Sequence, residues 1–398
     1  MNEWEKKFRK PIMSTVPLLR LSGLYFAYFS FVGAFSPYFS LYLQSLGRTA
    51  AEIGVLLSLM QFMRIFAPNL WGAMADARGR RAALLQLALA AATLSWCGVF
   101  FTDGFWGLFA VLALVSFFTG AALPLAEVVT FSHLREDPGR YGPVRVWGSI
   151  GFIVAVLGVG AALDLHPIGM LPWFVLACLA AALACSGLIR DTAGEARHGA
   201  ERPVWPLLAR PEVAVLFAAC FLMCAAHGPL YTFYSIYLAE HGYSKSAIGA
   251  LWSAGVAAEI VVFMVMPALF RRFSPHAVLV ASFGCAAARF VMIGWGVESI
   301  AVLLLAQLLH AATFAAYHAA AIGIVNDMFR DGQRARGQAL YTSLSFGAGG
   351  MLGAMASGVA WEALGPAWTF TLGSGCAFLG LILLLWRGKM SPAVSATA

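Results

Sequence analysis

Residues 125–152 read LAEVVTFSHLREDPGRYGPVRVWGSIGF. Two apolar segments meet here at a polar turn, and each carries an ionisable residue, Glu127 in the first and Arg145 in the second. Both lie nine residues from Glu136 in the turn, so a tight antiparallel helix pair would place them at similar depth. A lone charge of either sign in hydrocarbon costs roughly 2.5–3.5 kcal/mol even on insertion scales. We therefore expect these charges to be paired or to face a cavity that uses them.

The composition is that of a polytopic membrane protein. Hydrophobic residues make up 61% of the 398 and charged residues only 11%, which excludes an ordinary soluble domain. The 7 cysteines all lie in apolar runs, so we interpret them as packing residues rather than disulfides or metal ligands. The basic N-terminal segment precedes a full-length apolar run without a small-residue cleavage site, and we expect no signal peptide.

Apolar runs of spanning length predict an all-α membrane protein with twelve transmembrane helices in two six-helix bundles. We expect residues 1–190 and 213–398 to form the bundles, residues 191–212 to be a cytoplasmic linker, and a pseudo-twofold axis to relate the halves. The loops at 72–81 and 267–276 share little sequence, so the evidence for an internal repeat is thin. The predicted helices span residues 18–45, 53–75, 82–102, 105–134, 143–163, 168–189, 213–239, 246–270, 276–296, 299–326, 337–361 and 366–386.

The lysine and arginine residues give the expected orientation. With the N-terminus inside, 21 of them lie in cytoplasmic segments and only Arg48 and Lys245 in outer loops, as the positive-inside rule requires. We therefore expect a multi-pass protein of a bacterial inner membrane with both termini in the cytoplasm. The net charge of +7 is then a topology signal and not a nucleic-acid-binding surface. The expected partners are the lipid bilayer and a small-molecule substrate, and we expect a monomer.

The loop after the second predicted helix reads GAMADARGRR (72–81) and resembles the helix 2–3 signature of the major facilitator superfamily. In that family this loop locks the two halves together in the outward-facing state. Ala77 stands where a basic residue is usual and Arg78 where a large apolar residue is usual, so a weaker or differently paired gate is expected. The resemblance implies a gating role for Gly72, Asp76, Gly79, Arg80 and Arg81.

Within the superfamily the chain resembles the phenylpropionate permease-like group, which is related to the lactose permease-like proton symporters. The resemblance covers most of the chain and depends on residues 28–43, 64–76, 141–152 and 307–320. It implies that Glu127 and Arg145 contribute to substrate binding. It also implies that Glu259, Arg289 and His310 contribute to substrate recognition and proton coupling. Thr313 replaces the proton-carrying carboxylate that the family has three residues after the histidine, so any proton coupling must use another group.

The residues themselves indicate a polar chamber. Ionisable groups within membrane spans are functional by default, although structural ion pairs between helices are the alternative. The tenth predicted helix places His310, Phe314, Tyr317 and His318 on one face, which indicates a cavity lining rather than isolated helix–helix hydrogen bonds. Glycine-rich faces in residues 143–163 and 337–361 predict close helix packing. The residues assigned to the chamber are Glu127, Arg145, Glu259, Arg289, Arg64, His310, His318, Tyr28, Tyr231 and Tyr234, with His227 a weaker candidate.

These features favour a proton-coupled symporter that imports a small organic solute by alternating access. Three membrane arginines against two glutamates favour a carboxylate substrate such as an aromatic acid, held by Arg145 or Arg289. Burial favours the protonated form of a carboxyl, so Glu127 or Glu259 would carry the coupling proton, and no other cofactor is expected. The fifth helix lacks the Gly-Pro pair of superfamily antiporters. Alternatives are a sugar or nucleoside symporter, or an exporter of a siderophore, drug or lipid. The sequence contains no nucleophile motif and no phosphate-binding motif, so we do not expect an enzyme.

Overall fold

The computed structural model describes residues 15–134, 137–191, 210–329 and 333–390. Within these ranges every regular element is helical, and eleven helical stretches are long and apolar enough to cross a membrane. Each of the eleven matches a predicted span to within a few residues, so the prediction of an all-helical membrane protein is confirmed. The linker predicted at 191–212 lies mostly outside the described residues.

The first half contains α2 (Thr15–Phe35), α3 (Phe39–Ser45), α4 (Ala50–Met63), α5 (Ala67–Arg78), α6 (Arg81–Trp96), η1 (Cys97–Phe101), α7 (Phe105–His133), η2 (Pro138–Arg140), α8 (Tyr141–Leu165), η3 (Ile168–Met170) and α9 (Leu171–Gly187). The second half contains α11 (Pro211–Ala226), α12 (Gly228–Glu240), α13 (Lys245–Arg272), α14 (Pro275–Trp295), α15 (Ile300–Leu308), η4 (Ala312–Ala316), α16 (Tyr317–Met328), α17 (Arg334–Tyr341), η5 (Thr342–Gly349), α18 (Gly350–Leu364) and α19 (Pro366–Met390).

The remaining predicted span, residues 337–361, is also helical. It lies within the consecutive elements α17, η5 and α18, in which η5 is a π-helical segment. Its many glycine and serine residues make it less apolar than the other spans. They suit a helix that packs closely against others, and α18 packs against α4 of the first half and α12 of the second.

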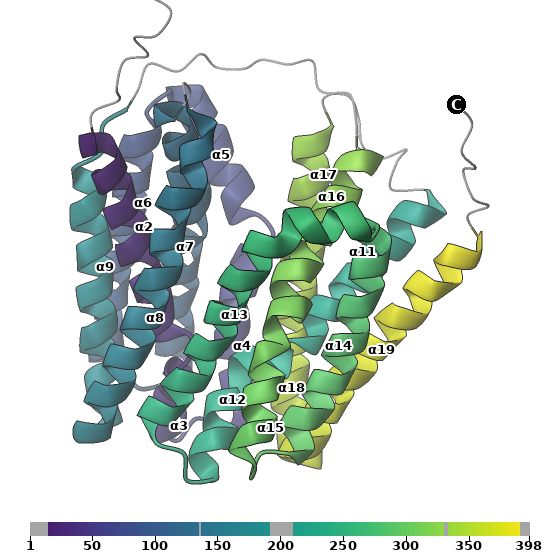
Figure 1. Ribbon diagram of the computed structural model, residues 1–398. Coiled ribbons are helices and arrows are strands. Elements are labelled where there is room, and N and C mark those ends of the chain that lie inside the picture. The colour runs from purple at the N-terminus through teal and green to yellow at the C-terminus, as the bar shows by residue number, and fades with distance from the viewer. Residues whose placement is uncertain (1–14, 135–136, 192–209, 330–332, 391–398) are drawn as a thin grey trace, which may run out of the picture.

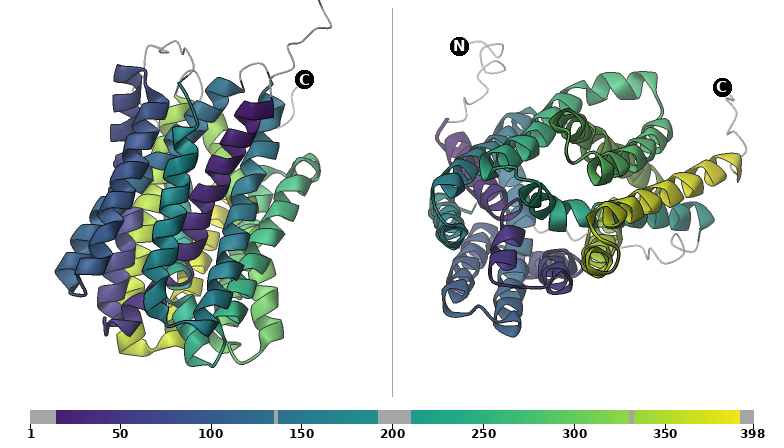
Figure 2. Two further views of the ribbon diagram at one scale, coloured as in Figure 1. Left: turned by 90° about the vertical axis from the view of Figure 1, so that its left-hand side faces the viewer. Right: turned by 90° about the horizontal axis from the view of Figure 1, so that it is seen from below.

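The helices form two bundles, α2–α9 and α11–α19, which lie side by side (Figures 1 and 2). We call the end with the last turn of α9 and the first turn of α11 the linker end, and the opposite end, with residues 46–49 and 241–244, the far end. The ribbons of the two bundles converge toward the far end and diverge toward the linker end (Figure 1). The bundles contact each other mainly through α18 with α4, α13 with α8, and α12 with α3.

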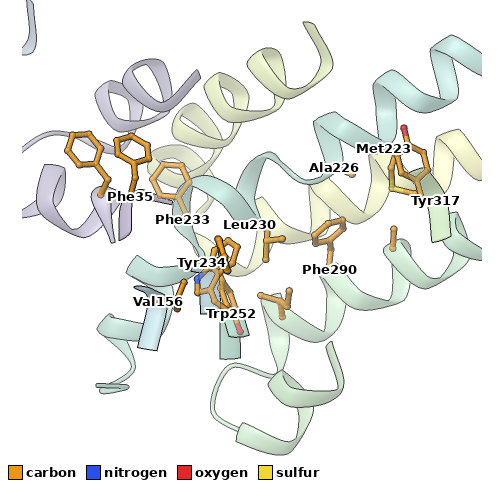
Figure 3. Close-up of a cluster of buried hydrophobic side chains, with 14 of the residues drawn as sticks. Phe35, Val156, Met223, Ala226, Leu230, Phe233, Tyr234, Trp252, Phe290 and Tyr317 are labelled. Atoms are coloured by element: carbon orange, nitrogen blue, oxygen red, sulfur yellow. The ribbon is translucent and has the colours of Figure 1, made fainter. Parts of the chain in front are cut away.

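Burial follows the same division. One cluster of buried apolar residues runs through both bundles, and a second is confined to the first bundle toward the linker end. In the shared cluster, Phe35 and Val156 of the first bundle lie near Phe233 and Trp252 of the second (Figure 3). Apolar burial therefore joins the two halves in the far part of the molecule.

Several spans are interrupted near their middle. Turns separate α2 from α3 and α4 from α5, His227 separates α11 from α12, and the π-helical segments η4 and η5 interrupt two others. Local sequence accounts for two of these breaks, because Pro37 and Pro229 cannot donate a helical hydrogen bond. Such interruptions free backbone groups, and π-bulges are frequent at functional sites.

The structure corrects one expectation about the opening stretch. Helices α7 and α8 do not pack as a tight pair, since α8 packs against α2 and α13, and α7 against α6, α4 and α5. The reason lies in the glycines of α8. A Cβ added to Gly151 would clash with the backbone of Phe26 on α2, and a Cβ on Gly33 of α2 would lie 2.6 Å from Phe152 O. The small-residue face of α8 is thus turned toward α2, which confirms that these glycines permit close packing.

This packing makes Gly151 and Gly158 a matched pair on one helix. We expect Gly151→Ala to destabilise the protein by about 1–3 kcal/mol, because the added methyl group forces α2 and α8 apart. Gly158→Ala should leave stability unchanged or slightly raised, since nothing lies within 4 Å of its added Cβ. Thermal unfolding of the purified variants in detergent measures the difference. Equal melting temperatures for the two variants would contradict the assigned contact.

Candidate functional site

The first bundle contributes a tyrosine and a carboxylate from the two sides of the charged turn. Tyr141 begins α8, and its hydroxyl donates a hydrogen bond of 3.2 Å to Oε1 of Glu127 on α7. The Tyr141 ring stacks on Phe131, with ring centroids 4.6 Å apart. Glu127 is half-buried. Tyr141 therefore links α7 to α8 at the point where the helices themselves do not pack.

Arg145 lies one turn further along α8 and is also half-buried. Its guanidinium lies over the ring of Phe29 at 4.2 Å and near that of Tyr25 at 5.7 Å, which are cation–π distances. Gly148 makes room for this arrangement, because a Cβ there would lie 2.8 Å from both Arg145 Nη1 and the Phe29 ring.

Glu127 and Arg145 do not form a direct ion pair. Among the described residues no nitrogen of Arg145 lies within 4.0 Å of a carboxylate oxygen, although the two charges interact electrostatically. An aromatic ring supports the guanidinium in place of an ion pair. A cation held this way keeps its N–H groups available for another acceptor.

The second bundle holds a tightly bonded acid–histidine pair. Nε2 of His310 lies 2.7 Å from Oε1 of Glu259, and the two side chains are 7% and 14% exposed. Gly255, one turn before Glu259 on α13, allows the approach, since its added Cβ would lie 3.2 Å from the His310 ring. Nδ1 of His310 is buried without a hydrogen-bond partner among the described residues.

Arg289 on α14 is completely buried beside this pair. Its Nε donates to Ala306 O at 2.8 Å, Nη2 to Gln307 Oε1 at 3.2 Å, and Nη1 to Thr313 Oγ1 at 3.1 Å. The threonine that replaces the family's carboxylate is thus a hydrogen-bond partner of this arginine. In the observed conformation Arg289 joins α14 to the interrupted span α15–η4, and its guanidinium is not exposed.

Aromatic and imidazole rings line the space around these charges. His227, at the break between α11 and α12, stacks on Tyr231 at 6.0 Å and lies 6.3 Å from the His310 ring. Nδ1 of His227 must donate to Met223 O at 2.8 Å, which leaves Nε2 as a buried acceptor without a partner among the described residues. Tyr231 is partly exposed, whereas Tyr234 is fully buried in the shared cluster (Figure 3).

The predicted common face of the tenth span is confirmed for His310, Phe314 and His318. Tyr317 lies on another face, where its ring packs against Phe283 of α14. The ring of Phe314 stacks between those of His310 and His318, at 5.4 and 6.4 Å. His318 Nδ1 lies 3.2 Å from the hydroxyl of Tyr341 on α17, so this histidine also connects two helices.

Arg64 and Tyr28 lie where the bundles meet. Arg64 follows α4 in the break before α5 and is exposed. It interacts electrostatically with Tyr28 of the first bundle and Tyr231 of the second. Tyr28 is half-buried, and its hydroxyl donates to Thr119 O at 3.4 Å.

The predicted gating residues lie at the linker end. Gly79 ends α5 in the left-handed conformation with φ 64°, which explains a glycine there. Gly72 lies within α5, the exposed Arg80 precedes α6, and Arg81 is its first residue. The backbone of Asp76 is in α5, but its side chain lies outside the described part of the structure.

Charges of the two bundles lie within electrostatic reach of one another. Glu259 interacts electrostatically with Arg289 of its own bundle and with Arg145 of the other. Ions and aromatic rings between two bundles of membrane helices are typical of secondary transporters, and the comparisons with known proteins show a family of transporters and not of enzymes.

The chain belongs to the MFS_1-like family of the major facilitator superfamily, whose model matches residues 18–372. It is 29% identical over 382 residues to the "Probable 3-phenylpropionic acid transporter" of Escherichia coli (strain K12), covering 92% of this chain and 96% of that protein. It is 32% identical over 274 residues to the maltose permease of Geobacillus stearothermophilus, covering 67% and 68%. The crystal structure of the nucleoside transporter NupG has the same fold, with a TM-score of 0.80, 19% identity and coverage of 94% and 99%. The resemblance stated from the motifs is therefore confirmed.

Sequence reasoning missed the residues that hold the charges in place. Tyr141 lies inside the quoted stretch YGPVR, and its position four residues before Arg145 on one helix face was an available signal. Phe29 and Gln307 carried no such signal, because their roles depend on contacts between separate helices.

The environment of Arg289 predicts a difference between two Arg→Lys changes. We expect Arg289→Lys to lower stability by about 2–4 kcal/mol, because an ammonium group cannot reproduce the three fixed contacts. Arg64→Lys should leave the melting temperature unchanged, since the Arg64 side chain is exposed and has no hydrogen bond or ion pair with the described residues. Thermal unfolding in detergent measures both variants. A harmless Arg289→Lys change would show that these contacts do not hold α14 to α15.

Proposed function

We propose that the protein is a proton-coupled symporter that imports a small organic carboxylate, such as an aromatic acid, by alternating access. The single observation that carries the proposal is Arg145, a half-buried guanidinium supported by Phe29 and without an ion-pair partner among the described residues. A substrate carboxylate would supply the missing anion, and the planar guanidinium binds carboxylates through two parallel hydrogen bonds. The adjacent rings of Phe29 and Tyr25 would contact an aromatic group.

Glu259 is the better of the two expected proton carriers. It is the more enclosed carboxyl, it is bonded to His310, and it lies within electrostatic reach of arginines from both bundles. Protonation of Glu259 would remove a negative charge from the chamber and leave a surplus of cations. A carboxylate substrate would then restore neutrality. Proton and anion thus favour each other's binding, which is the requirement for symport.

The conformation fits one state of such a cycle. We assign the linker end to the cytoplasm of a bacterial inner membrane, following the distribution of basic residues. The observed conformation, joined at the far end, would then be the inward-facing state of a monomer. Substrate and proton would enter after the far end opens, and the loop with Asp76 and Arg80 would close the linker end.

A neutral substrate is the main competitor. The maltose permease relative and the NupG fold argue for a sugar or nucleoside on the same scaffold, whereas the relative that matches 92% of the chain is described as a probable transporter of 3-phenylpropionic acid. Arg145 favours the carboxylate, because this half-buried guanidinium has no ion pair within 4.0 Å among the described residues, and a neutral solute would not supply one.

The first functional prediction concerns coupling. In membrane vesicles, acidifying the outer side should accelerate uptake of 3-phenylpropionate by the native protein. Glu259→Gln should abolish accumulation driven by the gradient while exchange of labelled for unlabelled substrate continues, because a permanently neutral side chain cannot release a proton. Glu127→Gln tests the other carboxyl. Gradient dependence that survives in both variants would remove the proposed proton carriers.

The second functional prediction concerns the substrate class. Ligand-induced thermal shifts of the purified protein should be large with 3-phenylpropionate and small with maltose or uridine. Arg145→Gln should eliminate the carboxylate shift, a loss of at least tenfold in affinity, since a charged hydrogen-bonded pair is removed. Arg20→Gln, at an exposed position of α2 outside the chamber, is the matched control and should retain the shift. Strong shifts with maltose or uridine that persist in Arg145→Gln would instead favour the neutral-solute function.

A further inference from the structure

At the far end, each bundle places a carboxylate on the first backbone amides of a helix in the other bundle. Asp164, in the last turn of α8, accepts hydrogen bonds from Lys245 N at 2.7 Å and Ser246 N at 3.0 Å, at the start of α13. Glu362, in the last turn of α18, accepts one from Ala51 N at 2.9 Å, at the start of α4. The first amides of a helix have no partner within it, and its N-terminus favours a negative charge.

The two contacts occupy equivalent places. Thr49 and Ser244 are the N-cap residues of α4 and α13, and each accepts a hydrogen bond from the third amide of its own helix. Ala51 and Ser246 are both the second residue of their helix. The sequences agree as well, with IGVLLS at 53–58 and IGALWS at 248–253. The internal repeat that the loops did not reveal is thus present at these helix starts.

A glycine precedes each carboxylate by four residues, in GAALD (160–164) and GVAWE (358–362). A Cβ added to Gly160 would lie 2.7 Å from Lys245 O, and one added to Gly358 would lie 2.5 Å from Ala50 O. Each glycine therefore lets the helix that bears the carboxylate approach the first residue of the helix that it caps. The glycine and the acid act as one repeated unit.

We propose that Asp164 and Glu362 form a paired latch that holds the far end closed, and that both contacts break together when this end opens. If the bundles move as rigid bodies, the motion that separates α8 from α13 also separates α18 from α4. Loss of a helix cap typically costs about 1 kcal/mol, so loss of either contact should shift the equilibrium between the closed and open far end by about fivefold. The inference rests on one part of the proposed function, the existence of a second state in which the far end is open. It does not depend on which substrate or coupling ion the protein uses.

Hydrogen–deuterium exchange of the protein in lipid nanodiscs tests the latch without any substrate. Exchange of a protected amide follows the population of the open form, and peptides that cover residues 49–58 and 244–253 contain the capped amides. We expect Asp164→Asn to raise exchange about fivefold in both peptides, because the asparagine NH₂ group opposes one of the two backbone N–H groups. Glu362→Ala should also raise both, and in the double variant the factors should multiply.

Two controls separate a latch from an ordinary cap. Asp103→Asn removes another far-end carboxylate of the first bundle, one without a hydrogen bond or ion pair in the described structure, and should change neither peptide. Glu52→Gln weakens the cap within α4 and should raise exchange in residues 49–58 alone.

The proposal is overturned if Asp164→Asn raises exchange only in residues 244–253. It is also overturned if Asp164→Asn, like Asp103→Asn, changes exchange in neither peptide. Should Asp164→Asn fail to fold, Glu362→Ala gives the reciprocal test, with the decisive signal in residues 244–253. Failed carboxylate transport with coupled exchange would refute the proposed function alone. Normal transport without coupled exchange would refute the latch alone.

Discussion

A polar group inside a bundle of membrane helices must find its partner within the protein, and this constraint organises the structure. Arg289 is the clearest case. It is fully buried, and its partners Ala306, Gln307 and Thr313 come from the region where the tenth span is interrupted. One partner is a backbone carbonyl in the last turn of α15 and the other two are side chains on either side of the break, so the buried cation joins the two parts of the interrupted span. The interruption and the arginine are best understood as a single feature.

The two bundles meet the same constraint in different ways. In the second, Glu259, His310 and Arg289 are enclosed and bonded to groups of their own bundle. In the first, Arg145 and Glu127 are half-buried and are held by an aromatic ring and a tyrosine hydroxyl. An enclosed acid suits the storage of a proton, and an accessible cation suits the capture of an anion. The electrostatic reach of Arg145 to Glu259 connects these two environments across the chamber.

The sequence predicted the helices well and the contacts between them poorly. Apolar length alone defines a membrane span, and a charge inside such a span has few places to lie. The expectation that α7 and α8 form a tight pair was wrong, because a short turn between two helices does not make them pack together. The glycines of α8 allow it to pack closely against α2 instead. Tyr28 and Tyr231 lie near the meeting of the bundles, but Tyr234 is buried, a distinction that depends on rotation about the helix axis and not on residue type.

The residues that join the bundles also explain how a closed end can reopen. Between α8 and α13, and between α18 and α4, glycines let backbones touch, so these surfaces have few interlocked side chains to disengage. Their polar contacts are directed at backbone amides, which water satisfies once the helices part. Closure of this kind is specific, because it needs the glycine and the acid in register. The free energy of closure is also small, because opening replaces a carboxylate acceptor with water at each backbone amide. A transporter that must visit two states needs both properties at the end that opens.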